Sequence, residues 1–167
     1  MFETPALIAA TAALIPLMLA ACYIDVRSLR IPNWIVLGVF ATFIVTGLWG
    51  LPLETFFWRL GYSAIALVVG FVLFSLSNGT VGGGDMKLTA ALVPFVAPQD
   101  VAHVLLLWVA LAIVGLIVHW MIYRYNRGRS TGWAALDQRI YFPVGLLIGL
   151  TMCFYLVAVL IVRLGWV

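Results

Sequence analysis

The sequence predicts an all-α fold: a polytopic membrane helix bundle with six transmembrane helices. Of the 167 residues, 65% are hydrophobic and 9% are charged, and the mean hydropathy is +1.17. A water-soluble domain carries about 25% charged residues, because its surface must be hydrated. The apolar residues also fall into six runs, which short polar segments separate. Lipid is therefore the expected solvent for most of the protein surface.

The six apolar runs give the expected transmembrane spans. A helix needs about 20 apolar residues to cross the hydrocarbon core of a bilayer. The expected spans are residues 5–24, 34–49, 61–77, 88–97, 101–123 and 140–164. The fourth is short, so it crosses only if its helix begins near Gly84 and the bilayer is locally thin or the helix tilts little. We see no internal repeat or domain boundary, and we expect residues 1–167 to form one transmembrane domain.

The basic residues predict the orientation of the spans. If the first loop is cytoplasmic, seven of the nine Lys and Arg residues lie inside: Arg27, Arg30, Lys87, Arg124, Arg127, Arg129 and Arg139. Only Arg59 and Arg163 then lie outside, as the positive-inside rule requires. Both termini are therefore expected on the non-cytoplasmic side. A re-entrant hairpin at residues 88–97 would move the later loops to the other side and remove this bias, which favours a crossing.

Two of the acidic residues are expected at the same edge of the membrane. Asp25 directly follows the first expected span, and Asp85 opens the fourth. Two crossings separate them, so both carboxyl groups should lie at the cytoplasmic edge and at similar depth. Ionisable groups at membrane depth are costly and indicate function. The simpler alternative is that each is a boundary residue paired with a nearby cation, Arg27 or Lys87.

Two neighbouring carboxyl groups can hydrolyse a peptide without a metal or a covalent nucleophile. One removes a proton from water while the other protonates the carbonyl oxygen, and the pair shares one proton because like charges at close range cannot both ionise. Asp25 is expected at a helix C-terminus and Asp85 at a helix N-terminus. The helix dipole then favours a protonated Asp25 and an ionised Asp85. The glycines before Asp85 would allow close approach of an extended substrate strand.

Three motifs resemble those of the type IV prepilin peptidases. The segment GGGDMK at residues 82–87 resembles the GxGD motif of that family. The segment YID at 23–25, followed by RIPN at 30–33, resembles its first-aspartate segment, and the segment IYFPVG at 140–145 resembles its late P-x-G motif. The motifs agree with the family in order, spacing and membrane position. The resemblance therefore extends over nearly the whole chain.

The resemblance implies an aspartic endopeptidase whose catalytic residues are Asp25 and Asp85. It implies removal of the short leader from type IV pilin-like precursors, just before their hydrophobic helix, at the cytoplasmic face of the bacterial inner membrane. The residues expected to bind substrate or shape the site are Gly82, Gly83, Gly84, Lys87, Arg30, Pro32, Asn33, Pro143 and Gly145. Membrane lipids are expected partners, whereas a metal, a cofactor and nucleic acid are not.

The chain resembles the small single-module peptidases of Flp or tight-adherence pilus systems. Larger members of the family carry a cytoplasmic insertion with paired CxxC motifs and also methylate the new N-terminus. Here only eight residues, 26–33, separate Asp25 from Trp34, and the two cysteines, Cys22 and Cys153, have no CxxC spacing. No methyltransferase activity is therefore expected.

Two functions of other classes remain as alternatives. One is a small proton-coupled membrane transporter, and the other is a non-enzymatic assembly protein of a pilus or secretion complex. A transporter usually carries its carboxylates near the bilayer midplane and has inverted repeats. The sequence predicts both aspartates at one edge and has no visible repeat, which favours the peptidase.

Overall fold

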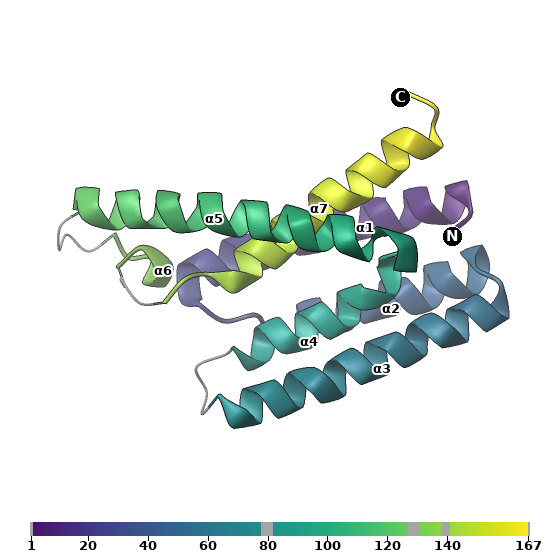
Figure 1. Ribbon diagram of the computed structural model, residues 1–167, viewed down its shortest axis with the longest axis horizontal. Coiled ribbons are helices and arrows are strands. Elements are labelled where there is room, and N and C mark those ends of the chain that lie inside the picture. The colour runs from purple at the N-terminus through teal and green to yellow at the C-terminus, as the bar shows by residue number, and fades with distance from the viewer. Residues whose placement is uncertain (1, 78–81, 127–130, 138–140, 167) are drawn as a thin grey trace.

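A computed structural model describes residues 2–77, 82–126, 131–137 and 141–166, and these residues form an all-helical protein (Figure 1). The α-helices are α1 (Thr4–Ser28), α2 (Asn33–Gly50), α3 (Leu53–Leu76), α4 (Gly83–Leu92), α5 (Val101–Asn126), α6 (Ala134–Asp137) and α7 (Val144–Arg163). Two 3-10 turns, Val93–Phe95 and Pro98–Asp100, join α4 to α5. The described residues contain no strand, which confirms the all-α class.

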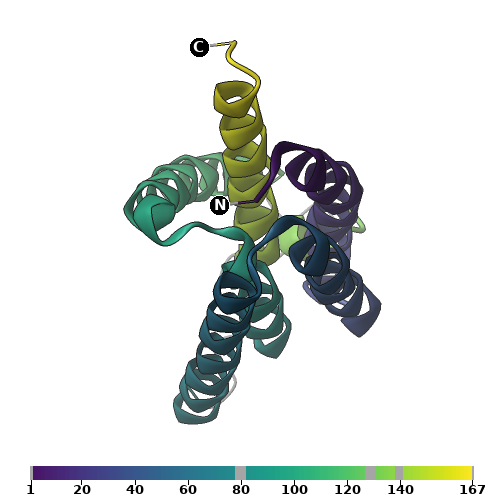
Figure 2. The same ribbon diagram turned by 90° about the vertical axis from the view of Figure 1, so that its right-hand side faces the viewer.

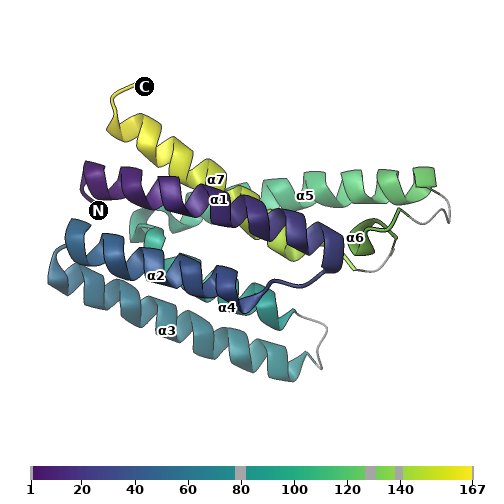
Figure 3. The same cartoon turned by 180° about the vertical axis from the view of Figure 1, so that it is seen from behind.

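Five of the described helices are long and apolar enough to cross a membrane: α1, α2, α3, α5 and α7. The most apolar window of each has a mean hydropathy between 1.6 and 2.8. The expected multi-pass membrane bundle is confirmed. Both termini lie at the same end of the molecule, as Figures 1 and 3 show. The side of the membrane that this end faces stays a prediction, and Arg127, Arg129 and Arg139 lie outside the described residues.

The fourth expected span is a half-length helix. The ten residues of α4 and the three of the turn Val93–Phe95 cover about 21 Å, at 1.5 and 2.0 Å of rise per residue. The hydrocarbon core is about 30 Å thick. Six expected spans therefore become five helices of spanning length and one short helix. In Figure 1, α4 leads the chain from the end where α3 finishes back to the end where α5 begins.

Two helix boundaries differ from the prediction in ways that affect the charged residues. Helix α1 continues to Ser28, so Asp25 lies inside it rather than after it. Helix α3 begins at Leu53 instead of residue 61, so Arg59 is inside a helix and only 3% exposed. The start is early because Pro52 precedes it and Glu54 lies in its first turn, where a negative charge is favourable.

Small residues let α1 and α7 pack closely, and this contact positions the site. Seen along the bundle in Figure 2, α7 lies between α5 and α1, and α3 packs against α4, which also contacts α2 and α7. A Cβ added to Gly149 of α7 would lie 2.5 Å from Sγ of Cys22 and 3.1 Å from the carbonyl oxygen of Met18, both on α1. Glycine is needed here because helices in lipid associate mainly through close packing.

Candidate active site

The segments that carry the two aspartates meet beside Ile31, which approaches both Gly84 and Gly145. Asp25 lies one turn before the end of α1 and is 4% exposed. Asp85 is the third residue of α4 and is half-buried. The negative charge of Asp25 acts on the carboxyl group of Asp85. Whether the two carboxyl groups act as a catalytic pair stays a prediction.

The carboxyl group of Asp25 lies on the first turn of α7. The backbone N–H of Leu146 donates a hydrogen bond to Oδ2 of Asp25 across 3.1 Å. A Cβ added to Gly145 would lie 2.8 Å from the same oxygen, so only glycine leaves room for the carboxyl group. The first N–H groups of a helix have no partner within the helix and carry partial positive charge. The hydrogen bond favours the negative form of Asp25 and so offsets part of the cost of burying its carboxyl group.

Ile31 joins the surroundings of the two aspartates. It is 9% exposed and lies in the short connection between α1 and α2. A Cβ added to Gly84, the residue before Asp85, would lie 3.4 Å from the backbone nitrogen of Ile31 and 3.5 Å from its oxygen. A Cβ added to Gly145 would lie 2.7 Å from Cδ1 of Ile31. The segments 82–87 and 140–145 therefore both approach Ile31, which belongs to the segment 30–33.

The glycines before Asp85 differ in their surroundings. Gly82 precedes α4 and is exposed, and a Cβ there would lie 2.5 Å from Oδ2 of Asp85. The carboxyl group of Asp85 therefore folds back over Gly82. A Cβ on Gly83 would meet the ring of Phe74 at 3.4 Å. Gly82 and Gly84 are thus the positions where a side chain would most disturb the segment that carries Asp85.

The remaining predicted site residues lie around the aspartates at helix starts and at the rim. Pro32 precedes α2 and Pro143 precedes α7. The Nζ of Lys87 donates to Oδ1 of Asn33 across 3.5 Å, and both side chains are exposed. Arg30 is also exposed. These exposed groups border the site, whereas Asp25 is buried and Asp85 is half-buried.

The expected charge state of Asp85 stays a prediction. Asp85 lies outside the five helices of spanning length, and burial, followed by the negative charge of Asp25, raises the pKa of its carboxyl group to about 7. The helix-end argument predicted an ionised Asp85. The first turn of a ten-residue helix does not offset the loss of water and the like charge nearby. Since α1 continues to Ser28, Asp25 lies in the last turn of the helix rather than after it, and its protonation also stays a prediction.

Other candidate side chains lie elsewhere or serve packing. The Sγ of Cys22 donates weakly to the carbonyl oxygen of Leu146 across 3.5 Å. Asp137 accepts hydrogen bonds from the N–H and hydroxyl of Thr131 and from the N–H of Gly132, so it shapes its own loop. The described residues contain no group of three His, Cys, Asp or Glu side chains that could hold a metal.

Sequence reasoning missed two parts of this arrangement, Ile31 and the backbone N–H of Leu146. A backbone donor has no residue-type signal, so no pattern indicated it. The spacing of Gly145 and Gly149 did offer a signal, because small residues four apart are typical of close helix contacts in membranes. It would have indicated the face of α7 that contacts α1.

A comparison with protein families supports the peptidase interpretation. The model of the type IV leader peptidase family matches residues 12–118, which is more than half of the chain and includes Asp25 and Asp85. The chain belongs to this family. Comparisons with curated proteins and with solved structures found no match. The family match ends at residue 118, before Pro143 and Gly145. The contact between α7 and Asp25 in this type IV leader peptidase family member is therefore known from the structure and not from the match.

Proposed function

We propose that this membrane peptidase is an aspartic endopeptidase that removes the short leader of type IV pilin-like precursors. The observation that carries the proposal is the convergence of the segments that bear Asp25 and Asp85 on Ile31 and the first turn of α7. Membership of the type IV leader peptidase family supports the reaction class. The positive-inside bias supports cleavage at the cytoplasmic face of the bacterial inner membrane.

The proposed protein is of the small Flp or tight-adherence type and has no methyltransferase activity. The eight-residue connection between Asp25 and Trp34 supports this, because it leaves no room for the insertion of the larger enzymes. The precursor would present its leader at the same edge as the two aspartates. The exposed Gly82 leaves the main chain accessible there, which suits the binding of an extended strand.

In the proposed first step, Asp25 is the base and Asp85 is the acid. The Asp25 carboxylate, held by the N–H of Leu146, takes a proton from a water molecule. The water oxygen bonds to the carbonyl carbon of the scissile peptide, and Asp85 gives its proton to the carbonyl oxygen. The product is a neutral tetrahedral diol, with Asp25 protonated and Asp85 ionised.

In the second step the C–N bond breaks and the protons return. Asp25 gives its proton to the leaving nitrogen, which becomes the new amino terminus of the precursor. One hydroxyl of the diol gives its proton to Asp85 as the carbonyl forms again. One water is consumed, and both aspartates regain their starting states.

Co-expression with an epitope-tagged pilin-like precursor tests the proposal. Immunoblots should show leader removal with the wild-type chain and none with Asp25→Asn or Asp85→Asn. Glu54→Gln is the matched control, because Glu54 is an exposed carboxyl in the first turn of α3 and should leave cleavage unchanged. The mass of the product should show an unmethylated N-terminus.

Two results of this experiment would contradict the proposal. Full processing by either aspartate variant would remove that residue from the mechanism. An uncut precursor in cells whose membranes contain the wild-type chain would overturn leader cleavage and favour a transport or assembly role.

A further inference from the structure

The far end of α4, away from the aspartates, is tied to α3 by two buried side chains. The hydroxyl of Ser63 donates to the carbonyl oxygen of Ala90 across 2.7 Å, and Nη1 of Arg59 donates to that of Pro94 across 2.8 Å. Ser63 is 6% exposed and Arg59 is 3% exposed. The last carbonyl groups of a helix have no partner within the helix. Helix α3 supplies those partners and so fixes the end of α4.

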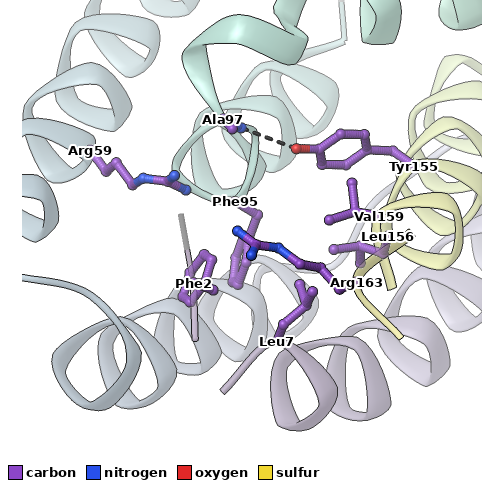
Figure 4. Close-up of a pocket in the computed structure, with 9 residues that line it drawn as sticks. All are labelled: Phe2, Leu7, Arg59, Phe95, Ala97, Tyr155, Leu156, Val159 and Arg163. Atoms are coloured by element: carbon purple, nitrogen blue, oxygen red, sulfur yellow. Dashed lines mark hydrogen bonds between the residues drawn. The ribbon is translucent and has the colours of Figure 1, made fainter. Parts of the chain in front are cut away.

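The same end of α4 is also tied to α7, through Tyr155. The hydroxyl of Tyr155 accepts a hydrogen bond from the N–H of Ala97 across 3.1 Å, which Figure 4 shows, and donates one to Oδ2 of Asp100 across 2.9 Å. Tyr155 is 8% exposed. Both partners lie in the connection between α4 and α5. Tyr155 therefore fixes this connection relative to α7.

Arg59 and Tyr155 line one small pocket at this end of the bundle (Figure 4). The pocket has room of about 10 Å³, which is the space of one water molecule. The Nε of Arg59 is buried, with no hydrogen-bond partner in the described part of the chain. The Arg59 guanidinium carbon lies 5.3 Å from the centre of the Phe2 ring. A buried cation is costly at membrane depth and indicates a role beyond local packing.

Helix α7 contacts both aspartate-bearing elements. Its first turn holds Asp25 through the N–H of Leu146, and Tyr155 holds the end of the segment that begins with Asp85. We infer that Arg59, Ser63, Tyr155 and Asp100 are positioning residues, which fix α4 along its axis and so set the place of Asp85 relative to Asp25. This inference rests on the proposed function. None of the four touches the reacting atoms.

A kinetic comparison separates positioning from a general loss of stability. Tyr155→Phe removes only the hydroxyl, and a misplacement of about 1 Å can cost up to roughly 100-fold in rate. We expect kcat for leader removal to fall roughly 10-fold or more, with KM unchanged within about twofold. Thr46→Val is the matched control, because it removes an equally buried hydroxyl whose 2.7 Å bond to Thr42 stays within α2.

Two kinetic results would contradict the positioning role. A wild-type kcat in Tyr155→Phe would overturn the inference, and so would an equal fall in kcat in Thr46→Val. Ser63→Ala should lower kcat in the same way as Tyr155→Phe, whereas Ser63→Thr keeps a hydroxyl and should restore the rate.

A distance measurement tests the inference without cleavage. Spin labels on Ser28→Cys in α1 and Thr89→Cys in α4, both exposed positions, report the place of α4 when Cys22 and Cys153 are replaced by alanine. Tyr155→Phe should shift or broaden this distance and Thr46→Val should not. An unchanged distance in Tyr155→Phe would overturn the inference. If the wild-type chain cleaved no precursor, the proposed function would be contradicted. The distance between the two labels would still test whether the four residues position α4.

Discussion

The backbone N–H of Leu146 donates to Oδ2 of Asp25 across 3.1 Å and joins two residues that are 121 positions apart in the chain. The contact fixes the end of α1 that carries Asp25 on the first turn of α7. A helix start favours the negative form of a carboxyl group. The proposed division of work, with Asp25 as base and Asp85 as acid, depends on this contact.

Gly145→Ala should lower the cleavage rate. The new Cβ would lie 2.8 Å from Oδ2 of Asp25 and 2.7 Å from Cδ1 of Ile31, so the carboxyl group must leave the Leu146 N–H. We expect a fall in kcat of roughly 10-fold to 100-fold, as for a misplaced catalytic group. Gly61→Ala is the control, since its Cβ meets nothing within 4 Å, and it should leave kcat unchanged. A wild-type rate in Gly145→Ala would contradict the role of this contact.

The cleavage rate should fall as the pH rises through about 7. Burial and the charge of Asp25 raise the pKa of Asp85 to about 7. The proton that Asp85 donates is therefore present below this pH and lost above it. The two carboxyls titrate as a pair, so the measured midpoint belongs to both. The dependence of kcat on pH, measured with purified protein in vesicles, checks the sign, and a rate that rises through pH 7 would contradict it.

Gly149→Ala should destabilise the contact between α1 and α7. Its Cβ would lie 2.5 Å from Sγ of Cys22, and overpacking of this kind costs about 1–3 kcal/mol. Cys22→Ala should relieve part of the cost in the double variant, because it removes the sulfur. The thermal unfolding midpoints of the two single variants and the double variant measure the coupling. Simply additive shifts would show that the sulfur is not the obstacle.

Lys87→Ala should have a small effect on cleavage. The bond from Lys87 to Asn33 is long, at 3.5 Å, and exposed. Such a bond contributes up to about 1 kcal/mol, so the rate should change by no more than about fivefold. Kinetics with a purified precursor measure this change. A loss as large as that of Asp85→Asn would instead make Lys87 a substrate or catalytic contact.

Hydropathy predicted most of the helices, but it failed where a charge is buried. The run before Gly61 contains Arg59 and Glu54, so hydropathy predicts a loop there. In the structure Arg59 is stabilised by Pro94 and Phe2, which are distant in sequence. Such partners appear only when the chain is folded. The shortness of α4 was visible in the sequence, because the apolar run after Lys87 is only ten residues long.

The sequence predicted which side chains form the candidate site, but it did not predict which backbone groups contact them. Counting the membrane crossings brought Asp25 and Asp85 to one edge. The assignment of the shared proton depends on the ends of α1 and α4, and helix ends are the least certain part of a sequence-based prediction, so this assignment stays a prediction. The sequence did not indicate that the backbone N–H of Leu146, in the first turn of α7, donates a hydrogen bond to Asp25.

The kinetics of the two aspartate variants and their combination test the central claim most directly. Purified wild-type, Asp25→Asn, Asp85→Asn and double-variant proteins are compared in the rate of leader removal from one precursor. If the two carboxyls act as a unit, each single variant loses roughly 1,000-fold or more, and the double variant loses no more than the singles. A wild-type rate in either single variant, or losses that multiply in the double variant, would contradict a shared catalytic pair.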